Sequence, residues 1–207
     1  QQNLTVTNTA VVPADELTYS LVAPVGFTSP GGPFAEAAGG GSNSHTITML
    51  TATAGVKGGN LAILSDDPDN PTKNVPLSGT VLRHAVPSLA GGVQTLSDTL
   101  DFGTHKEGEF TDGTASVSNV GYDALQALLN VYGATIVGGG GRFTLVPAFS
   151  AVNVNGTPAV FTVAFDDTGA ATGQDTTYTA TLVLSTRDQQ GLAGARGHVA
   201  GRWRRGR

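Results

Sequence analysis

The stretch GGNLAILSDDPDNPTKNVPLSGTV, residues 58–81, decides the fold class of this chain. Leu61 and Ile63 alternate with other residues in its first half, and Val75 and Leu77 do so in its second half. Successive side chains of a β-strand point to opposite faces, so this period of two predicts strands at 61–65 and 75–81. The intervening SDDPDNP is rich in Asp, Asn and Pro, which favour turns. The stretch therefore predicts two half-buried strands separated by a turn.

The same alternation recurs through all 207 residues. It predicts further strands at residues 4–9, 16–23, 45–53, 99–103, 115–119, 125–132, 143–146, 160–165, 178–185 and 198–203. Charged residues make up only 13% of the chain, and Gly and Thr take the place of the helix-forming Lys and Glu. Many short strands between turns are typical of β-sandwiches. The sequence predicts an all-β chain with a core that includes Leu61, Ile63, Leu77, Val81, Phe102, Phe161, Val163, Phe165, Leu182 and Leu184.

The two halves of the chain look like copies of one another. Asn8 in VTNTA matches Asn119 in VSNVG, each directly after an alternating strand. Further along, Ser65 is matched with Ser185, and LSGTV at 77–81 with VAGRW at 199–203. The stretch 85–92 between the copies has the composition of a linker. We therefore expect two tandem β-sandwiches, at residues 1–84 and 85–207.

The quoted string also carries a family resemblance. SDDPDNPTKNVPLSGTV, together with LDFG at 100–103, resembles the choice-of-anchor D and ASH (ASPM-SPD-2-Hydin) group of immunoglobulin-like domains. That resemblance implies two tandem immunoglobulin-like β-sandwiches, and its motifs are structural rather than catalytic. The second copy departs from the family, with STRDQQ at 185–190 in place of an SNDP motif. The first copy departs by lacking the opening strand.

The absent opening strand predicts an interaction surface. A sandwich without one of its edge strands exposes unpaired backbone groups and an apolar groove. Either the strand precedes this chain in a longer protein, or another chain supplies it. QQNLTVTNT at the N-terminus is already a strand pattern, so we expect a removed leader or a longer parent protein. The expected interaction residues are Leu4, Val6 and Asn8 in the first copy, and His198, Val199, Arg202, Trp203, Arg204 and Arg205 at the C-terminal strand.

The charge distribution bears on the partners. The net charge is −5; before Arg196 it is 6 − 16 = −10, and the five arginines from Arg196 onward return +5. An acidic body with a basic tail and 6% aromatic residues does not indicate nucleic-acid binding. No apolar run approaches the roughly 18 residues of a membrane helix, so we expect no membrane span. The expected partners are other copies, joined head to tail into a homo-polymer, or neighbouring domains of a longer chain.

No motif indicates catalysis or a cofactor. The chain has no Cys, its histidines (His45, His84, His105 and His198) are scattered, and no G-x-S-x-G elbow occurs. Asp66, Asp67 and Asp69 are weak candidates for a Ca²⁺ site, but the loop lacks EF-hand spacing. We expect these carboxylates to cap a turn instead. The sequence predicts no enzyme, no cofactor and no metal.

Three functions stay open at this point. We expect a structural or adhesive module of a secreted or cell-surface protein of bacterial type. One alternative is an intracellular protein-interaction module, because the resemblance also extends to ciliary and centrosomal proteins. The other is a glycan-binding domain, which needs a row of exposed aromatic residues. The tyrosines available for such a row are Tyr19, Tyr122, Tyr132 and Tyr178.

Overall fold

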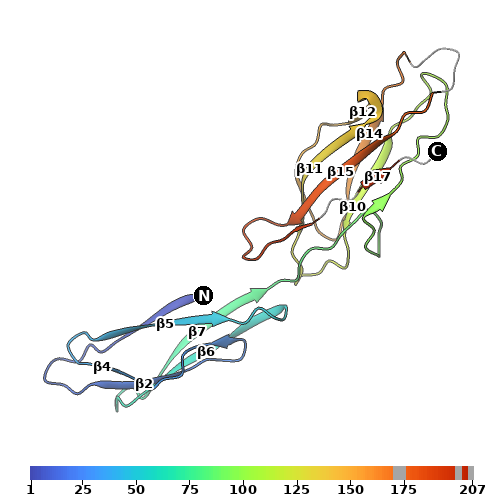
Figure 1. Cartoon of the computed structure of the whole chain (residues 1–207). Helices are drawn as coiled ribbons and strands as arrows, with labels where there is room; N and C mark the ends of the chain where they lie inside the picture. The colour runs from blue at the N-terminus through green and yellow to red at the C-terminus, as the bar shows by residue number, and fades with distance from the viewer. Residues whose placement is uncertain (170–175, 199–201, 205–207) are drawn as a thin grey trace. The chain divides into compact units, whose positions relative to one another are not determined.

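The structure, a computed structural model, describes residues 1–169, 176–198 and 202–204 and is all-β (Figure 1). It contains no α-helix within these residues, only a 3-10 turn at Gly139–Gly141. This confirms the predicted fold class. The strands are β1 Gln2–Thr7, β2 Leu17–Val22, β3 Phe27–Thr28, β4 Phe34–Glu36, β5 Ser42–Met49, β6 Gly55–Ser65, β7 Thr72–Val81, β8 Pro87–Ser88, β9 Ser97–Asp98, β10 Gly113–Asn119, β11 Leu129–Gly138, β12 Phe143–Leu145, β13 Val152–Val154, β14 Ala159–Phe165, β15 Ala180–Asp188, β16 Gly197–His198 and β17 Arg202–Arg204.

The chain divides into two compact units, Gln1–Leu82 and Arg83–Arg207. The sequence placed the division two residues later, after His84. Arg83 belongs to the second unit because its guanidinium lies 2.7 Å from the carboxylate of Asp123. His84 belongs there too, because its Nδ1 atom lies 2.7 Å from Asp188 Oδ2.

The first unit consists of two antiparallel sheets, with strand orders β1-β5-β3 and β4-β2-β6-β7. Its long hairpin β6–β7 contains both strands predicted from residues 58–81. The buried core draws side chains from both sheets, as the inward faces of alternating strands require. These core residues are Val6, Tyr19, Leu21, Ile47 and Leu61.

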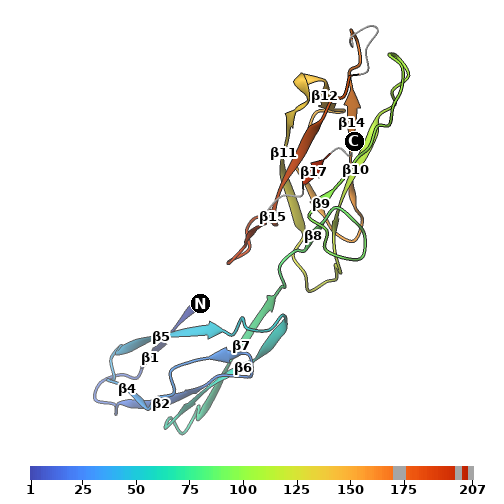
Figure 2. The same cartoon turned by 45° about the vertical axis from the view of Figure 1, so that its right-hand side comes forward.

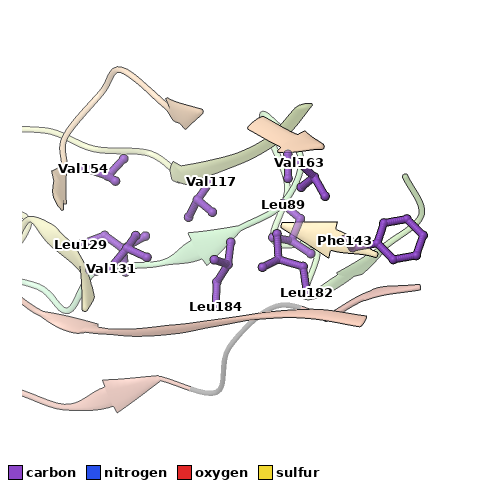
Figure 3. Packing of buried hydrophobic residues seen from close by; sticks show 11 residues of the cluster. Leu89, Val117, Leu129, Val131, Phe143, Val154, Val163, Leu182 and Leu184 are labelled. Atoms are coloured by element: carbon purple, nitrogen blue, oxygen red, sulfur yellow. The ribbon is translucent and has the colours of Figure 1, made fainter. Parts of the chain in front are cut away.

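The second unit repeats this arrangement with additional edge strands. Its sheets have the orders β8-β10-β14-β12 and β13-β11-β15-β17-β9, with β16 also paired to β15 (Figure 2). Among these described strands, the pairing of β9 with β17 is parallel and the others are antiparallel; an isolated parallel bridge joins Arg83 to Gln126. Figure 3 shows Val117 and Val163 facing Leu182 and Leu184, with Leu89 among them. The predicted core residues Leu61, Val163, Leu182 and Leu184 are buried, and Phe102, Ile63, Leu77, Phe161 and Phe165 are partly buried against the cores. Val81, the remaining predicted core residue, is half-buried at the end of β7 and belongs to neither cluster.

Two predictions about the start of the second unit are wrong. Residues 99–103 form no strand; Leu100 and Phe102 instead pack from a loop onto the core. The stretch 85–92 is no linker, because it contains β8 and buries Ala85 and Leu89 in the core of the second unit. Small residues and Pro made the stretch look like a linker, and its burial depends on contacts distant in sequence.

The predicted strand at 125–132 begins only at Leu129, and the strand at 178–185 is shifted to Ala180–Asp188. The predicted C-terminal strand at 198–203 is divided: β16 ends at His198 and β17 begins at Arg202. The predicted match of residues 77–81 with residues 199–203 does not agree with the strand pairing. Trp203 in β17 pairs with Leu182 of β15, and at the comparable place in the first unit Leu61 of β6 pairs with Val75, not with Val81. Residues 199–201 lie outside the described residues.

Candidate interaction site at the β1 edge

The strand pairings define which residues of the two units are equivalent. Gln2 pairs with Ile47 at the start of β1, as Gly113 pairs with Val163 at the start of β10. Beyond them, Phe27 pairs with Met49 in the first unit as Phe143 pairs with Phe165 in the second. Leu4, Val6 and Asn8 therefore correspond to Ala115, Val117 and Asn119.

Asn119 is a buried hydrogen-bonding centre at the end of β10. Its Nδ2 atom donates to Ala127 O at 2.9 Å and to Val154 O at 3.4 Å. Its Oδ1 atom accepts from Val86 N at 2.9 Å and from Gln126 Nε2 at 3.2 Å. The side chain thus holds three different segments to the end of the strand.

Asn8 repeats half of this arrangement in the first unit. Its Nδ2 atom donates to Asp15 O at 3.3 Å and to Glu36 O at 2.9 Å, the counterparts of the two carbonyls bound by Asn119. Its Oδ1 atom accepts from Ala10 N at 3.1 Å. The sequence match of Asn8 with Asn119 is thus reflected in equivalent contacts, although the pattern alone did not reveal that both side chains are buried.

In the second unit, residues 83–98 cover the C-terminal end of the outer edge of β10; we call them the opening segment. Ser88 lies opposite Ser118, and Val120 N donates to Val86 O at 2.8 Å. On the inner side, Ala85 and Leu89 enter the core. Further along, β9 adds to the other sheet beside β17. One segment therefore closes both layers.

In the first unit, no described residue pairs with the outer edge of β1. Asn8 N donates to Gly41 O at 2.8 Å, on the side where β5 lies. Successive amides along a strand point to alternate sides, so the amides of Thr7 and Thr9 point toward the open edge. These groups correspond to those of Ser118 and Val120, which face the opening segment.

The open edge also leaves apolar side chains less covered. Leu17 and Leu4 are half-buried, whereas their counterparts Leu129 and Ala115 are both 0% exposed. Leu129 lies in the same buried cluster as Ala85 and Leu89 of the opening segment. The first unit therefore has an apolar margin at the place that the opening segment covers in the second.

β1 differs from the other edge strands in carrying no feature that prevents pairing. The edges formed by β3, β4, β8, β9, β12 and β13 are two or three residues long. β7 is long, but it contains Lys73 and Pro76, which discourage the addition of another strand. β1 has six residues, QNLTVT, without charge or Pro. Its backbone is the candidate interaction site.

The predicted interaction residues have different environments. Val6 and Asn8 are buried and Leu4 is half-buried, so they shape the site from within while the backbone forms its surface. His198 pairs with Thr186 through β16. Arg202 and Trp203 pair on both sides, with β15 and β9, and Arg204 pairs with β15. Val199 and Arg205 lie outside the described residues.

The aspartates considered for Ca²⁺ stabilise a turn. Asp67 Oδ1 accepts from the amides of Asp69 and Asn70, and Asp66 Oδ1 accepts from Thr18 N at 3.0 Å. No bond from the Asp69 carboxylate contributes to this turn network. Within the described part of the chain, no three His, Cys, Asp or Glu residues group into a metal site. No helix there is long and apolar enough to cross a membrane.

A polar pair is buried behind β1. Tyr19 Oη lies 2.7 Å from Nε2 of His45, the residue opposite Leu4 in β5. Phe34 packs against both rings. Burial, followed by the nearby charge of Glu36, raises the pKa of Tyr19 above its ordinary value. The pair leaves no signal in the local sequence, because its two residues lie 26 positions apart in the chain.

Comparison with known proteins gives little further information. No protein-family model and no curated protein matches this chain. It is similar to a crystal structure of a protein of unknown function from Porphyromonas gingivalis W83, at 17% sequence identity and a TM-score of 0.33, over 97% of this chain and 89% of that one. This likeness is too weak to support an argument about fold or function.

Proposed function

We propose that this chain is a non-catalytic structural or adhesive module, made of two immunoglobulin-like units of the ASH type, within a larger assembly. The observation that carries the proposal is the open, uncharged edge of β1, whose counterpart in the second unit is covered at its C-terminal end by β8. An edge of this kind favours contact with another polypeptide through backbone hydrogen bonds. We propose that a strand of a neighbouring unit completes the first sandwich.

The proposal includes a location at the cell surface or outside the cell, in a protein of bacterial type. The composition supports it, with 29 Gly and few charges, and the absence of Cys is compatible with it. A large core makes disulfides unnecessary for a stable extracellular module.

Light scattering over a concentration series tests the adhesive edge. We expect the apparent mass of the wild-type chain to rise with concentration, because two unfilled edges pair weakly with one another while the strand that completes the sandwich is missing. Thr7→Pro removes an amide that points toward the open edge and leaves the β5 side intact. We expect this variant to remain close to the 20.9 kDa of the single chain.

A wild-type chain that keeps the mass of a monomer at every concentration, indistinguishable from Thr7→Pro, would contradict an adhesive edge. Lys73→Thr, which removes the charge from β7 at the opposite sheet, is the matched comparison. Association that increases in this variant would show that the edge charge on β7 prevents pairing there. Negative-stain microscopy of the same samples distinguishes regular fibres from irregular aggregates.

A further inference from the structure

We propose that the strand that fills the β1 edge has the chemistry and the direction of the opening segment, residues 83–98, and is supplied by a neighbouring unit of the assembly rather than by a second copy of β1. The inference rests on the proposed function and names the partner of the same site. Its basis is a comparison of the two units of this chain. The second unit contains the site with a strand bound, and the first unit contains the same site without one.

The direction follows from the pairing of β8 with β10. These strands are antiparallel, with Ser88 opposite Ser118. In the first unit, the partner strand therefore runs antiparallel to β1, and its residue that corresponds to Ser88 lies opposite Thr7. Two residues earlier in the partner, a carbonyl accepts from the amide of Thr9, as Val86 O accepts from Val120 N.

Asn8 provides a second attachment point. A side-chain amide oxygen has two lone pairs and can accept two hydrogen bonds. Asn119 Oδ1 has two partners, one of which is Val86 N of the opening segment. Asn8 Oδ1 has one, Ala10 N, among the described residues. The remaining position fits the backbone amide of a partner strand.

The side chains of the partner follow from what the opening segment buries. Ala85 and Leu89, four residues apart, enter the core cluster that contains Leu129. A small apolar residue followed four positions later by a larger one would cover the half-buried Leu17 in the same way. Residues 85–97 carry no charge, which avoids burying one at the apolar margin.

The position of Pro87 defines the outer limit of the completed sheet. It lies opposite Asn119 in β8 and has no amide to donate outward. A partner strand with Pro at this place ends the sheet, so each unit accepts one strand and no more. This feature distinguishes a completed unit from one whose sheet could add further strands.

The test joins a second copy of residues 83–98 to Gln1 through a Gly/Ser linker of about ten residues, long enough to fold back along β1. The control carries the same sixteen residues in scrambled order. We expect the amides of Thr7 and Thr9 to exchange with solvent about ten-fold or more slowly in the fusion than in the control. Thr7→Pro in the fusion should remove the protection at Thr9, while unchanged exchange at Ile47 and Leu61 shows that the first unit remains folded.

Equal exchange in the fusion and the scrambled control would overturn the inference. So would an unfused chain whose self-association gives Thr7 and Thr9 the full protection of the fusion, because a second copy would then occupy the edge as well as the opening segment does. The unfused chain could associate, with Thr7→Pro abolishing the association, while the fusion shows no protection. In that case the proposed function stands and the partner chemistry inferred here is wrong. The fusion could instead show protection while the unfused chain does not associate at any concentration. In that case the partner chemistry stands and the proposal of an adhesive edge is wrong.

Discussion

The carboxylate of Asp188 lies 2.7 Å from Nδ1 of His84 and is almost completely buried, so the last residue of β15 holds the first residues of the opening segment. Its Oδ1 atom accepts from Ala85 N at 2.8 Å, and Oδ2 also accepts from Arg196 N at 2.9 Å. A buried carboxylate requires such partners, because its desolvation is costly when it has none. The second unit therefore fastens its own covering segment at a specific point.

We predict that Asp188→Ala destabilises the second unit. It leaves the buried amide of Ala85 without its acceptor, which costs about 1–3 kcal/mol for each orphaned group. Urea unfolding, monitored by hydrogen exchange of the Val117 and Leu184 amides, measures the loss of stability. Asp112→Ala, at an exposed position, is the control and should change the stability by less than about 0.5 kcal/mol. Equal effects of the two substitutions would show that Asp188 does not hold the segment.

We predict that Asn119→Ala is more damaging than Asn8→Ala. Both substitutions remove the donor to two carbonyls, which are buried at Asn119 and part-buried at Asn8, and Asn119→Ala also removes the acceptor of Val86 N. We expect a loss of about 2 kcal/mol at Asn8 and about 1 kcal/mol more at Asn119. Hydrogen exchange of core amides gives the value for each unit separately. Asn74→Ala, exposed on β7, should have little effect, and a larger loss at Asn8 than at Asn119 would contradict the comparison.

We predict that the first unit loses stability at alkaline pH through Tyr19. Burial raises its pKa in the folded state above the ordinary value of about 10, so the folded unit holds a proton that the unfolded chain releases. This stability is fully present below about pH 10 and is lost as the pH rises through the folded pKa. The free energy of unfolding between about pH 8 and pH 12 should fall more steeply in the wild type than in Tyr19→Phe. Tyr132→Phe, in the second unit, should leave the slope of the first unit unchanged.

We predict that Gly41→Ala weakens the corner that supports Asn8. A Cβ atom at Gly41 would lie 2.5 Å from Ala37 O and 2.8 Å from Ala37 N, both backbone atoms that cannot move aside cheaply. The same glycine accepts the hydrogen bond from Asn8 N. We expect a loss of about 2 kcal/mol or more in thermal or urea unfolding. Gly31→Ala meets no atom within 4 Å and serves as the matched control; a comparable loss there would attribute the effect to backbone entropy or local conformation instead.

The sequence by itself determined the fold class and the internal repeat. Alternation at Leu61, Ile63, Val75 and Leu77 is a local property, and a half-buried strand imposes it wherever one face meets a core. The match of Asn8 with Asn119 was visible for the same reason, because each residue follows directly after its own alternating strand. The turn at 65–71 was equally local, since Asx side chains bond to amides two or three residues away.

Only the tertiary structure decided which segments close the two units. The stretch 85–92 has the composition of a linker, yet contacts with β10 and the rest of the core bury Ala85 and Leu89. Leu100–Gly103 has the motif of a strand, yet its residues pack from a loop. Asp188 is buried by residues about 100 positions away in sequence, and Tyr19 meets His45 across the two sheets. An open edge at β1 is likewise a property of strand order, since pairing between distant segments is set by packing and chain topology and leaves no period in the local sequence.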